Sequence, residues 1–460
     1  MNSLLATMIA LGTVAFGAVY PWAYVPLFGA AAAIGVAGLH RAGLDPELRP
    51  LALALFVVCG AATAQLMPMP TVLLARVSPA TPALLRAYDL VFAGAPSWAP
   101  VSIRPPSTAI AVVSVIALSL YLVGLPRLLS PRALRSLPGA LAMVAVPVAV
   151  YGMYSREYNN GLIYGFWHPQ DGGGGNQFGP FINRNHFGGW MLMILALLIG
   201  SVVGHVEAAL NDHPRRSQRA FAWLSSSSAS RLMLTGAVVI LGTVAVFWSL
   251  SRSSIISLTF LCAMFTSLAA RRRRLGTMRK GLIAASIGSV MMAGLLWRGP
   301  DRVVTWFQDD RNLLGRVDAW RDASDVIRAF PLFGTGLNTF GEAMLFYQTR
   351  NAGFHMAQAH NDYVQLAAEG GLLLVVPAIV VAVLLVVAIR RNLRAARAES
   401  RGYWIRTGAA IGLVAIAIQE MVEFSLQIPV NTLLFATLAA VALTPVSSPV
   451  APDPAGASTG

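Results

Sequence analysis

The sequence predicts an all-α, polytopic membrane protein with about twelve transmembrane helices. Hydrophobic residues make up 56% of the 460-residue chain and charged residues only 12%, against about 25% in soluble domains. The mean hydropathy is +0.63. Apolar runs separated by short polar segments fill most of the chain, and a bilayer core of about 30 Å requires roughly 20 apolar residues per helix. We therefore interpret these runs as membrane spans.

The predicted spans take up residues 1–446, which we interpret as one transmembrane domain. They begin near Ser3, Trp22, Pro50, Thr108, Leu137, Phe187, Leu232, Ile255, Gly281, Leu372, Thr407 and Pro429. Since no Lys or Arg precedes the first run, we expect a retained first helix and not a cleaved signal peptide. The last residues, 447–460, are rich in Pro, Ala and Ser and are predicted to form a disordered cytoplasmic tail.

The distribution of basic residues predicts the orientation of the spans. With the N-terminus in the cytoplasm, 21 of the 34 Lys and Arg residues fall in the short cytoplasmic loops, as the positive-inside rule requires. The net charge of +14 would indicate nucleic-acid binding in a soluble chain, but here the charges lie in loops between spans. No nucleic-acid partner is predicted. Both cysteines, Cys59 and Cys262, lie in apolar runs, where a thiol acts as a small hydrophobe.

Three polar clusters fall on the same, outer side in this topology. The first is the run Asn183-Arg184-Asn185-His186, just before the sixth span, and the second is Ser251-Arg252-Ser253, between the seventh and eighth spans. The third is the long polar loop 298–371, between the ninth and tenth spans. Because separate segments converge on one side of the membrane, we interpret the loop as the active-site loop.

The two arginines of the first clusters are candidate anion ligands. Arg252 interrupts an otherwise uncharged stretch from Leu232 to Ala270, and an arginine presents a planar fork of donors that suits phosphate oxygens. With Arg184, it could clamp the two phosphates of an anionic lipid carrier. The alternative is a side chain that snorkels to the interface and only marks a turn.

His360 is the candidate general base, because it directly precedes a helix for which Asn361 or Asp362 is the expected N-cap. A helix N-terminus disfavours the imidazolium form, which keeps the ring able to accept a proton. The alternative is a histidine that only hydrogen-bonds the cap.

Three polar residues follow on one face of that helix, at i, i+3 and i+7: Asp362, Gln365 and Glu369. Either they line a cavity as substrate-binding groups, or they form a solvated first turn. A metal site built from His355, His360 and these carboxylates lacks the ligand spacing that would support it. We predict no metal and no other cofactor.

A helix is predicted from Leu314 to Ala329, with polar and apolar faces, and Pro331 ends it. Gly334 and Gly336 then permit a tight backbone path, and the whole unit is interpreted as a lid in the membrane interface. Arg316 either joins the anion site or pairs with aspartates of its own helix.

The order of these motifs resembles the O-antigen ligase and polymerase family. The resemblance covers Phe16 to about Pro429 and is carried by Asn183-Arg184-Asn185-His186-Phe187, Ser251-Arg252-Ser253, Gly315-Arg316 with Trp320, Pro331 with Gly334 and Gly336, and His360-Asn361 with Glu369-Gly370. It implies a glycosyltransferase of the GT-C-like kind in the bacterial inner membrane, surrounded by membrane lipids and with its active site facing the periplasm. The donor would be an undecaprenyl-diphosphate-linked glycan and the acceptor a lipid-linked or glycan hydroxyl, with no metal required.

The resemblance also suggests roles for the candidate residues. Arg184 and Arg252 would hold the diphosphate and His360 would act on the acceptor hydroxyl, so that a single displacement inverts the anomeric centre. The predicted substrate-binding residues are Asn183, Asn185, Arg316, Asn361, Gln365 and Glu369. The sequence does not separate ligase, polymerase and protein glycosyltransferase branches.

Two other functions remain open from the sequence. A proton-coupled or anion transporter is suggested by Glu420 and Glu423, which we expect in the outer part of the eleventh span. The other is a non-catalytic component of a polysaccharide assembly complex.

Overall fold

We describe a computed structural model of the chain that covers residues 1–158, 160–169, 176–212, 227–271, 311–350, 353 and 355–446, with isolated positions between 281 and 296. The predicted ninth span lies largely outside these residues. So do the first part of the loop 298–371 and the whole of the predicted tail, 447–460.

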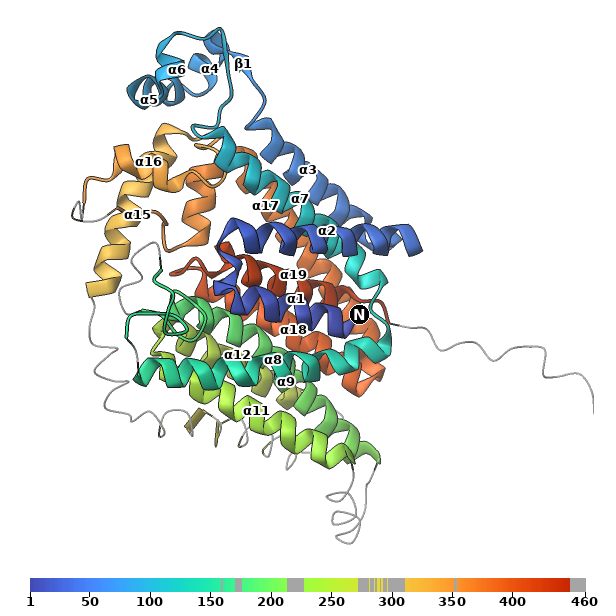
Figure 1. The fold of residues 1–460 in the computed structure, drawn as a ribbon. Coiled ribbons are helices and arrows are strands. Elements are labelled where there is room, and N and C mark those ends of the chain that lie inside the picture. The colour runs from blue at the N-terminus through green and yellow to red at the C-terminus, as the bar shows by residue number, and fades with distance from the viewer. Residues whose placement is uncertain are drawn as a thin grey trace, which may run out of the picture.

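Apolar helices form the body of the molecule (Figure 1). They are α1 (Asn2–Val14), α2 (Pro21–Ala42), α3 (Arg49–Ala64), α7 (Pro105–Gly124), α8 (Pro131–Glu157), α9 (Arg184–Asp212), α11 (Ser227–Ser249), α12 (Arg252–Arg271), α17 (Asp362–Ala395), α18 (Ser400–Gln419) and α19 (Pro429–Leu443). Single 3-10 turns occur at Phe16–Ala18, Pro46–Leu48, Leu125–Arg127, Ala396–Ala398 and Ser425–Gln427. Within the described residues, eight helices are long and apolar enough to cross a membrane. The all-α, polytopic class is therefore confirmed, whereas the number of twelve and the GT-C-like arrangement stay predictions.

Helix α9 is the centre of the core and packs among α8, α11, α12 and α18. Trp190 and Leu195 on α9 are completely buried. Helix α18 approaches α9 at Gly200 and Gly408, where an added Cβ would lie 2.4 Å from a backbone oxygen of the opposite helix. Small residues allow such close backbone contact between membrane helices. Near the start of α9, an added Cβ at Gly188 would lie 1.9 Å from the hydroxyl oxygen of Ser254, so α12 packs closely against the turn that follows Arg184.

A separate unit covers one end of the bundle. The chain between α3 and α7 forms β1 (Met69–Pro70), α4 (Thr71–Val77), α5 (Ala80–Tyr88), α6 (Leu90–Ala93) and β2 (Trp98–Ala99), with Met69 paired antiparallel to Ala99. It lies near α15 (Arg311–Ala329) and α16 (Phe340–Tyr347) of the long loop (Figure 1). Buried side chains of the two segments, Leu85, Phe92 and Val101 with Val326, Phe330 and Met344, form one second core. We call the segment between α3 and α7, together with residues 311–347 of the long loop, the outer cap. The predicted helix from Leu314 to Ala329 is present as α15.

Helix α17 breaks at Gly371, whose φ of 54° and ψ of −163° are not helical. The segment 331–336 runs along this break. Two of its carbonyls accept hydrogen bonds from the amides of Leu372 and Leu373, at 2.9 Å each, and two of its amides donate to carbonyls just before the break, at 3.1 and 3.0 Å. The backbone groups that the break releases therefore find partners in the outer cap. This joins the cap to the membrane helix.

Replacing Gly334 by alanine is expected to disrupt this junction. Gly334 has φ +66°, and a Cβ there would lie 2.2 Å from the carbonyl carbon of Glu369, so strain and a backbone clash act together. The expected result is a lowered melting temperature and loss of monodisperse protein in detergent. Gly315→Ala is the matched control, since nothing lies within 4 Å of its added Cβ and alanine favours the helix by about 1 kcal/mol. Equal melting of both variants would contradict the proposed junction.

Candidate functional site

Three chain segments meet on the carboxylate of Glu423, which is 1% exposed. Arg316 of α15 donates to its Oε1 at 2.6 Å, and the hydroxyl of Ser253, at the start of α12, donates to the same atom at 3.3 Å. The side chain of Asn185, at the start of α9, also hydrogen-bonds this carboxylate. The start of α9, the start of α12 and the long loop are therefore brought together, and of the two alternatives for Arg316 the structure shows pairing with another segment.

Charged side chains from several segments act on Arg184, among them Arg156 of α8. We call Arg184, Arg252 and Arg316, together with Glu423, the cationic cluster. The charges of Arg252, Arg316 and Glu423 all act on the guanidinium of Arg184, which begins α9 and is 9% exposed. Burial raises the pKa of Glu423 above its ordinary value, and the charge of Arg316 opposes this rise. Guanidinium groups gathered from separate segments suit a multivalent anion, because each presents a planar fork of donors to phosphate oxygens.

The two asparagines beside Arg184 shape the start of α9. The side-chain oxygen of Asn183 accepts a hydrogen bond from the amide of Asn185 at 2.9 Å. The carbonyl of Asn185 accepts from the side chain of Gln419 at 3.0 Å, which ties α9 to the end of α18. The structure thus gives both asparagines contacts that position Arg184.

His360 lies beside this cluster and packs against Phe424. Its ring is perpendicular to the Phe424 ring, with centroids 4.9 Å apart, and the ring of His186 lies 4.6 Å from Phe424 in the same edge-on manner. The Nδ1 atom of His360 and the Nε2 atom of His186 are buried without a hydrogen-bond partner among the described residues. His360 also adopts a left-handed backbone with φ 50°, a conformation that is often kept at functional sites.

Burial lowers the pKa of His360 to about 4, and the positive charge of Arg316 adds to this effect. The ring is therefore neutral at neutral pH. The sequence led us to expect a neutral ring because of the helix N-terminus, whereas burial is the larger cause. The N-cap is Asn361, whose side-chain oxygen accepts from the amides of Tyr363 and Val364 at 3.0 and 3.1 Å.

Gln365 and Glu369 are buried, so the alternative of a solvated first turn is wrong for them. The carboxylate of Glu369 accepts from the amides of Phe340 and Asn338 at 3.0 and 2.8 Å, and from the Gln365 side chain at 3.0 Å. Glu369 therefore anchors the turn before α16. The side-chain oxygen of Gln365 accepts from the amide of Ala359 at 3.0 Å, which positions the residue next to His360.

Asp362 and Glu420 form a carboxyl pair whose titrations affect each other. Asp362 accepts a hydrogen bond from the Gln427 side chain at 2.7 Å, and Glu420 accepts one from the amide of Ser425 at 2.6 Å. Burial raises the pKa of Glu420 well above its ordinary value, and the charge of Asp362 raises it further. Glu420 caps the end of α18 and Glu423 follows in the next turn. Our expectation that both glutamates lie within the eleventh span is wrong, because α18 ends at Gln419.

A metal site is not formed by the residues considered from the sequence. Among the described residues, no group of three or more His, Cys, Asp or Glu side chains is close enough to hold a metal ion. His355 lines a separate cavity beside α16. Cys59 and Cys262 are both free thiols.

Sequence reasoning missed the residues that join the cluster together. Phe424, on which both histidines pack, and Gln427, whose side-chain nitrogen donates to Asp362 at 2.7 Å, carried no signal. Both lie in a short loop whose spatial neighbours are remote in the sequence. His186 belongs to the first polar cluster of the sequence, but no function was predicted for it. Glu423 was expected in the outer part of the eleventh span, where it could line the outer cavity, but its pairing with Arg316 was not predicted.

Comparison with known proteins adds one match. Residues 237–379 match the family model described as O-Antigen ligase. No curated protein matches the chain. The matched segment includes Arg252, Arg316 and His360, whereas Arg184 and Glu423 lie outside it.

Proposed function

We propose that this chain, which belongs to the O-antigen ligase family, transfers a glycan from undecaprenyl diphosphate to an acceptor hydroxyl at the periplasmic face of the bacterial inner membrane. The family and the apolar helices make it a multi-pass membrane protein with a ligase-like or polymerase-like role in polysaccharide biosynthesis. The observation that supports the finer proposal is that Arg316 is paired with Glu423, that the charges of Arg252, Arg316 and Glu423 act on Arg184, and that Arg316 also acts on His360.

The arginine cluster suits the leaving group of such a transfer. When the bond between the anomeric carbon and the diphosphate oxygen breaks, the departing diphosphate gains negative charge. Fixed guanidinium donors in a buried site stabilise that charge strongly, because they need no reorganisation during the reaction. In this proposal Arg184 and Arg252 hold the diphosphate and Arg316 completes the site, with Glu423 fixing its orientation. The arginines would stabilise the negative charge of the leaving diphosphate, so the proposed reaction requires no metal ion.

His360 is the group that would accept the acceptor proton. The acceptor oxygen forms a bond to the anomeric carbon as the diphosphate leaves, and the hydroxyl proton passes to the neutral imidazole. One displacement inverts the configuration of that carbon. The unpartnered, buried Nδ1 of His360 supports this role. Asn183, Asn185, Asn361, Gln365 and Glu369 position these groups.

Deletion of the gene tests the proposed reaction. We expect glycan to stay on its undecaprenyl carrier. Accumulated carrier-linked polymer would identify a ligase, and accumulated single repeat units a polymerase. Normal amounts of finished glycan with no carrier-linked intermediate would overturn the proposal. The family match gives no support to the transporter alternative, and the glutamates that suggested it lie outside the spans.

The proposed periplasmic face can be tested with a thiol reagent that does not cross membranes. In a variant without Cys59 and Cys262, cysteine at Leu90 or Arg328 should react in right-side-out vesicles, because both side chains are well exposed on the outer cap. Cysteine at Glu47 or Arg391, an exposed pair at the opposite end, should react only in inverted vesicles. The reverse pattern would place the site in the cytoplasm.

A further inference from the structure

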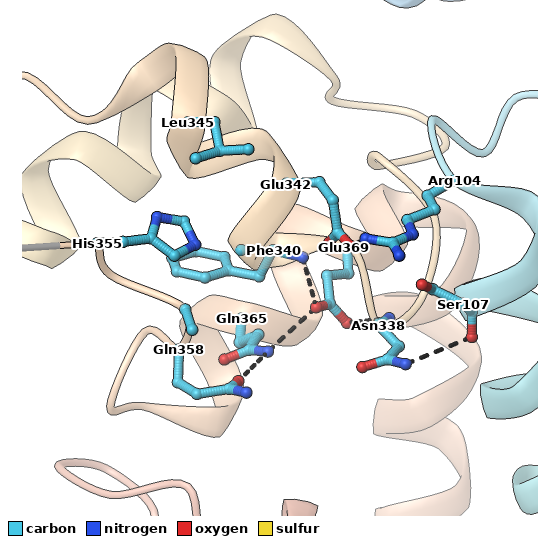
Figure 2. A pocket seen from close by; sticks show the side chains of 12 residues that line it. Arg104, Ser107, Asn338, Phe340, Glu342, Leu345, His355, Gln358, Gln365 and Glu369 are labelled. Atoms are coloured by element: carbon cyan, nitrogen blue, oxygen red, sulfur yellow. Dashed lines mark hydrogen bonds and ion pairs between the residues drawn. The ribbon is translucent and has the colours of Figure 1, made fainter. Parts of the chain in front are cut away.

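A hollow near the cationic cluster is lined by different residues. Its volume is about 400 Å³, and its walls come from the start of α7, from α16, from the segment 355–358 and from Gln365 and Glu369 of α17 (Figure 2). The cationic cluster is built from α9, α12, α15 and the loop after α18. The two sites are joined at the start of α17, where Gln365 donates to Gln427 of the loop after α18 at 3.1 Å. We call this hollow the polar pocket.

The lining of the polar pocket is nearly balanced in charge. Arg104, at the start of α7, forms an ion pair with Glu342 of α16 (Figure 2). The carboxylate of Glu369 accepts hydrogen bonds from the backbone amides of Asn338 and Phe340. The other polar groups include the neutral side-chain amides of Asn338 and Gln358. Among its lining residues no cationic excess occurs, so the pocket does not suit a diphosphate.

These groups suit a neutral ligand with many hydroxyls. Each sugar hydroxyl both donates and accepts hydrogen bonds, and side-chain amides and a paired Arg and Glu offer both functions. Leu345, which is 66% exposed, adds an apolar surface for the C–H face of a ring. The volume lies at the lower end of the range for small-ligand sites and has room for roughly one or two sugar rings.

The polar pocket is also coupled to His360 through one side chain. Gln365 donates from its amide nitrogen to Gln358 at 2.9 Å, and its oxygen accepts from the amide of Ala359 at 3.0 Å. Ala359 directly precedes His360. A ligand held on Gln358 therefore touches the same hydrogen-bond network that positions the proposed base. On the opposite wall, Asn338 is fixed with φ 60° by its bond to Glu369.

We propose that the polar pocket binds sugar residues of the acceptor and orients the reacting hydroxyl toward His360. The assignment to the acceptor rests on the proposed function. In that proposal the donor diphosphate binds at the cationic cluster, which leaves the polar pocket for the acceptor. The binding of a neutral saccharide is a property of the pocket alone and can be measured without turnover.

Gly341 provides the sharpest test, because a side chain added there grows into the polar pocket. Its added Cβ would lie 3.4 Å from Ala357 and from the His355 ring, which is an ordinary contact. Gly341→Ala is therefore the control, and Gly341→Leu fills the pocket. Full-length protein in nanodiscs would be probed by saturation-transfer NMR with lactose, maltose and N,N′-diacetylchitobiose. We expect wild type, Gly341→Ala and the surface variant Arg328→Ala to bind at least one disaccharide, and Gly341→Leu and Gln358→Ala to bind it at least tenfold more weakly.

The outcomes separate this proposal from the proposed function. Disaccharide binding that persists in Gly341→Leu, that is displaced by inorganic pyrophosphate, or that is absent from wild type would overturn the saccharide pocket. His360→Ala should keep the binding while losing transfer. If deletion of the gene leaves glycan synthesis intact but the pocket binds disaccharide, the proposed function fails and the saccharide site remains.

Discussion

Replacing His360 by alanine is expected to lower turnover by about 10² to 10⁴, the usual range for loss of a general base. The wild-type rate should rise with pH through an apparent pKa near 4 and then stay flat, because imidazolium cannot accept the acceptor proton and the neutral ring can. His360→Ala should lose this rising limb and keep donor binding. The measurement is turnover as a function of pH in membranes, with donor affinity determined separately.

His186→Ala is the matched control, since His186 packs on the same Phe424 ring. It should keep the rising limb. Arg316→Gln removes a charge that lowers the pKa of His360, so it should move the limb to higher pH. If His360→Ala loses donor binding and keeps the pH profile, the imidazole belongs to the diphosphate site. Asp362, Glu369 or Glu342 would then become the candidate base.

Replacing Arg252 by lysine should lower turnover by about 10² to 10³, the cost of removing one donor from a preorganised anion site. Lysine keeps the positive charge but loses the planar fork that binds two oxygens at once. Membrane insertion and abundance should stay normal, because the charge that marks the turn before α12 is retained. Turnover with a purified carrier-linked donor, normalised to protein in the membrane, measures the effect.

Arg328→Lys serves as the control for this substitution, because Arg328 is exposed on α15 and pairs only locally with Asp325 at 2.7 Å. It should be fully active. Wild-type turnover in Arg252→Lys would leave Arg252 as a marker of topology. A loss of protein from the membrane would instead show that the residue is needed for folding.

The helical body could be predicted from the sequence because a membrane span is a local property of about 20 consecutive residues. The convergence of Arg184, Arg252 and Arg316 followed from topology, since alternate helix ends must lie on one side. Glu423, Phe424 and the second core of the outer cap could not be found in this way. Their contacts join residues that are far apart in the sequence, such as Arg316 and Glu423, and no sequence pattern encodes such a pair.

The break in α17 at Gly371 also sets the height of the site above the bilayer. From Leu372 to the helix end at Ala395 the rise is about 36 Å at 1.5 Å per residue, slightly more than a hydrocarbon core of about 30 Å. The lower part of the helix exposes Leu372, Ile379 and Val383 by more than half, as a lipid-facing surface does. In the proposed function the break would lie at the boundary between acyl chains and headgroups, with His360 one short helix above it. A lipid diphosphate at that boundary would then reach His360 while its polyprenyl chain stays in the leaflet.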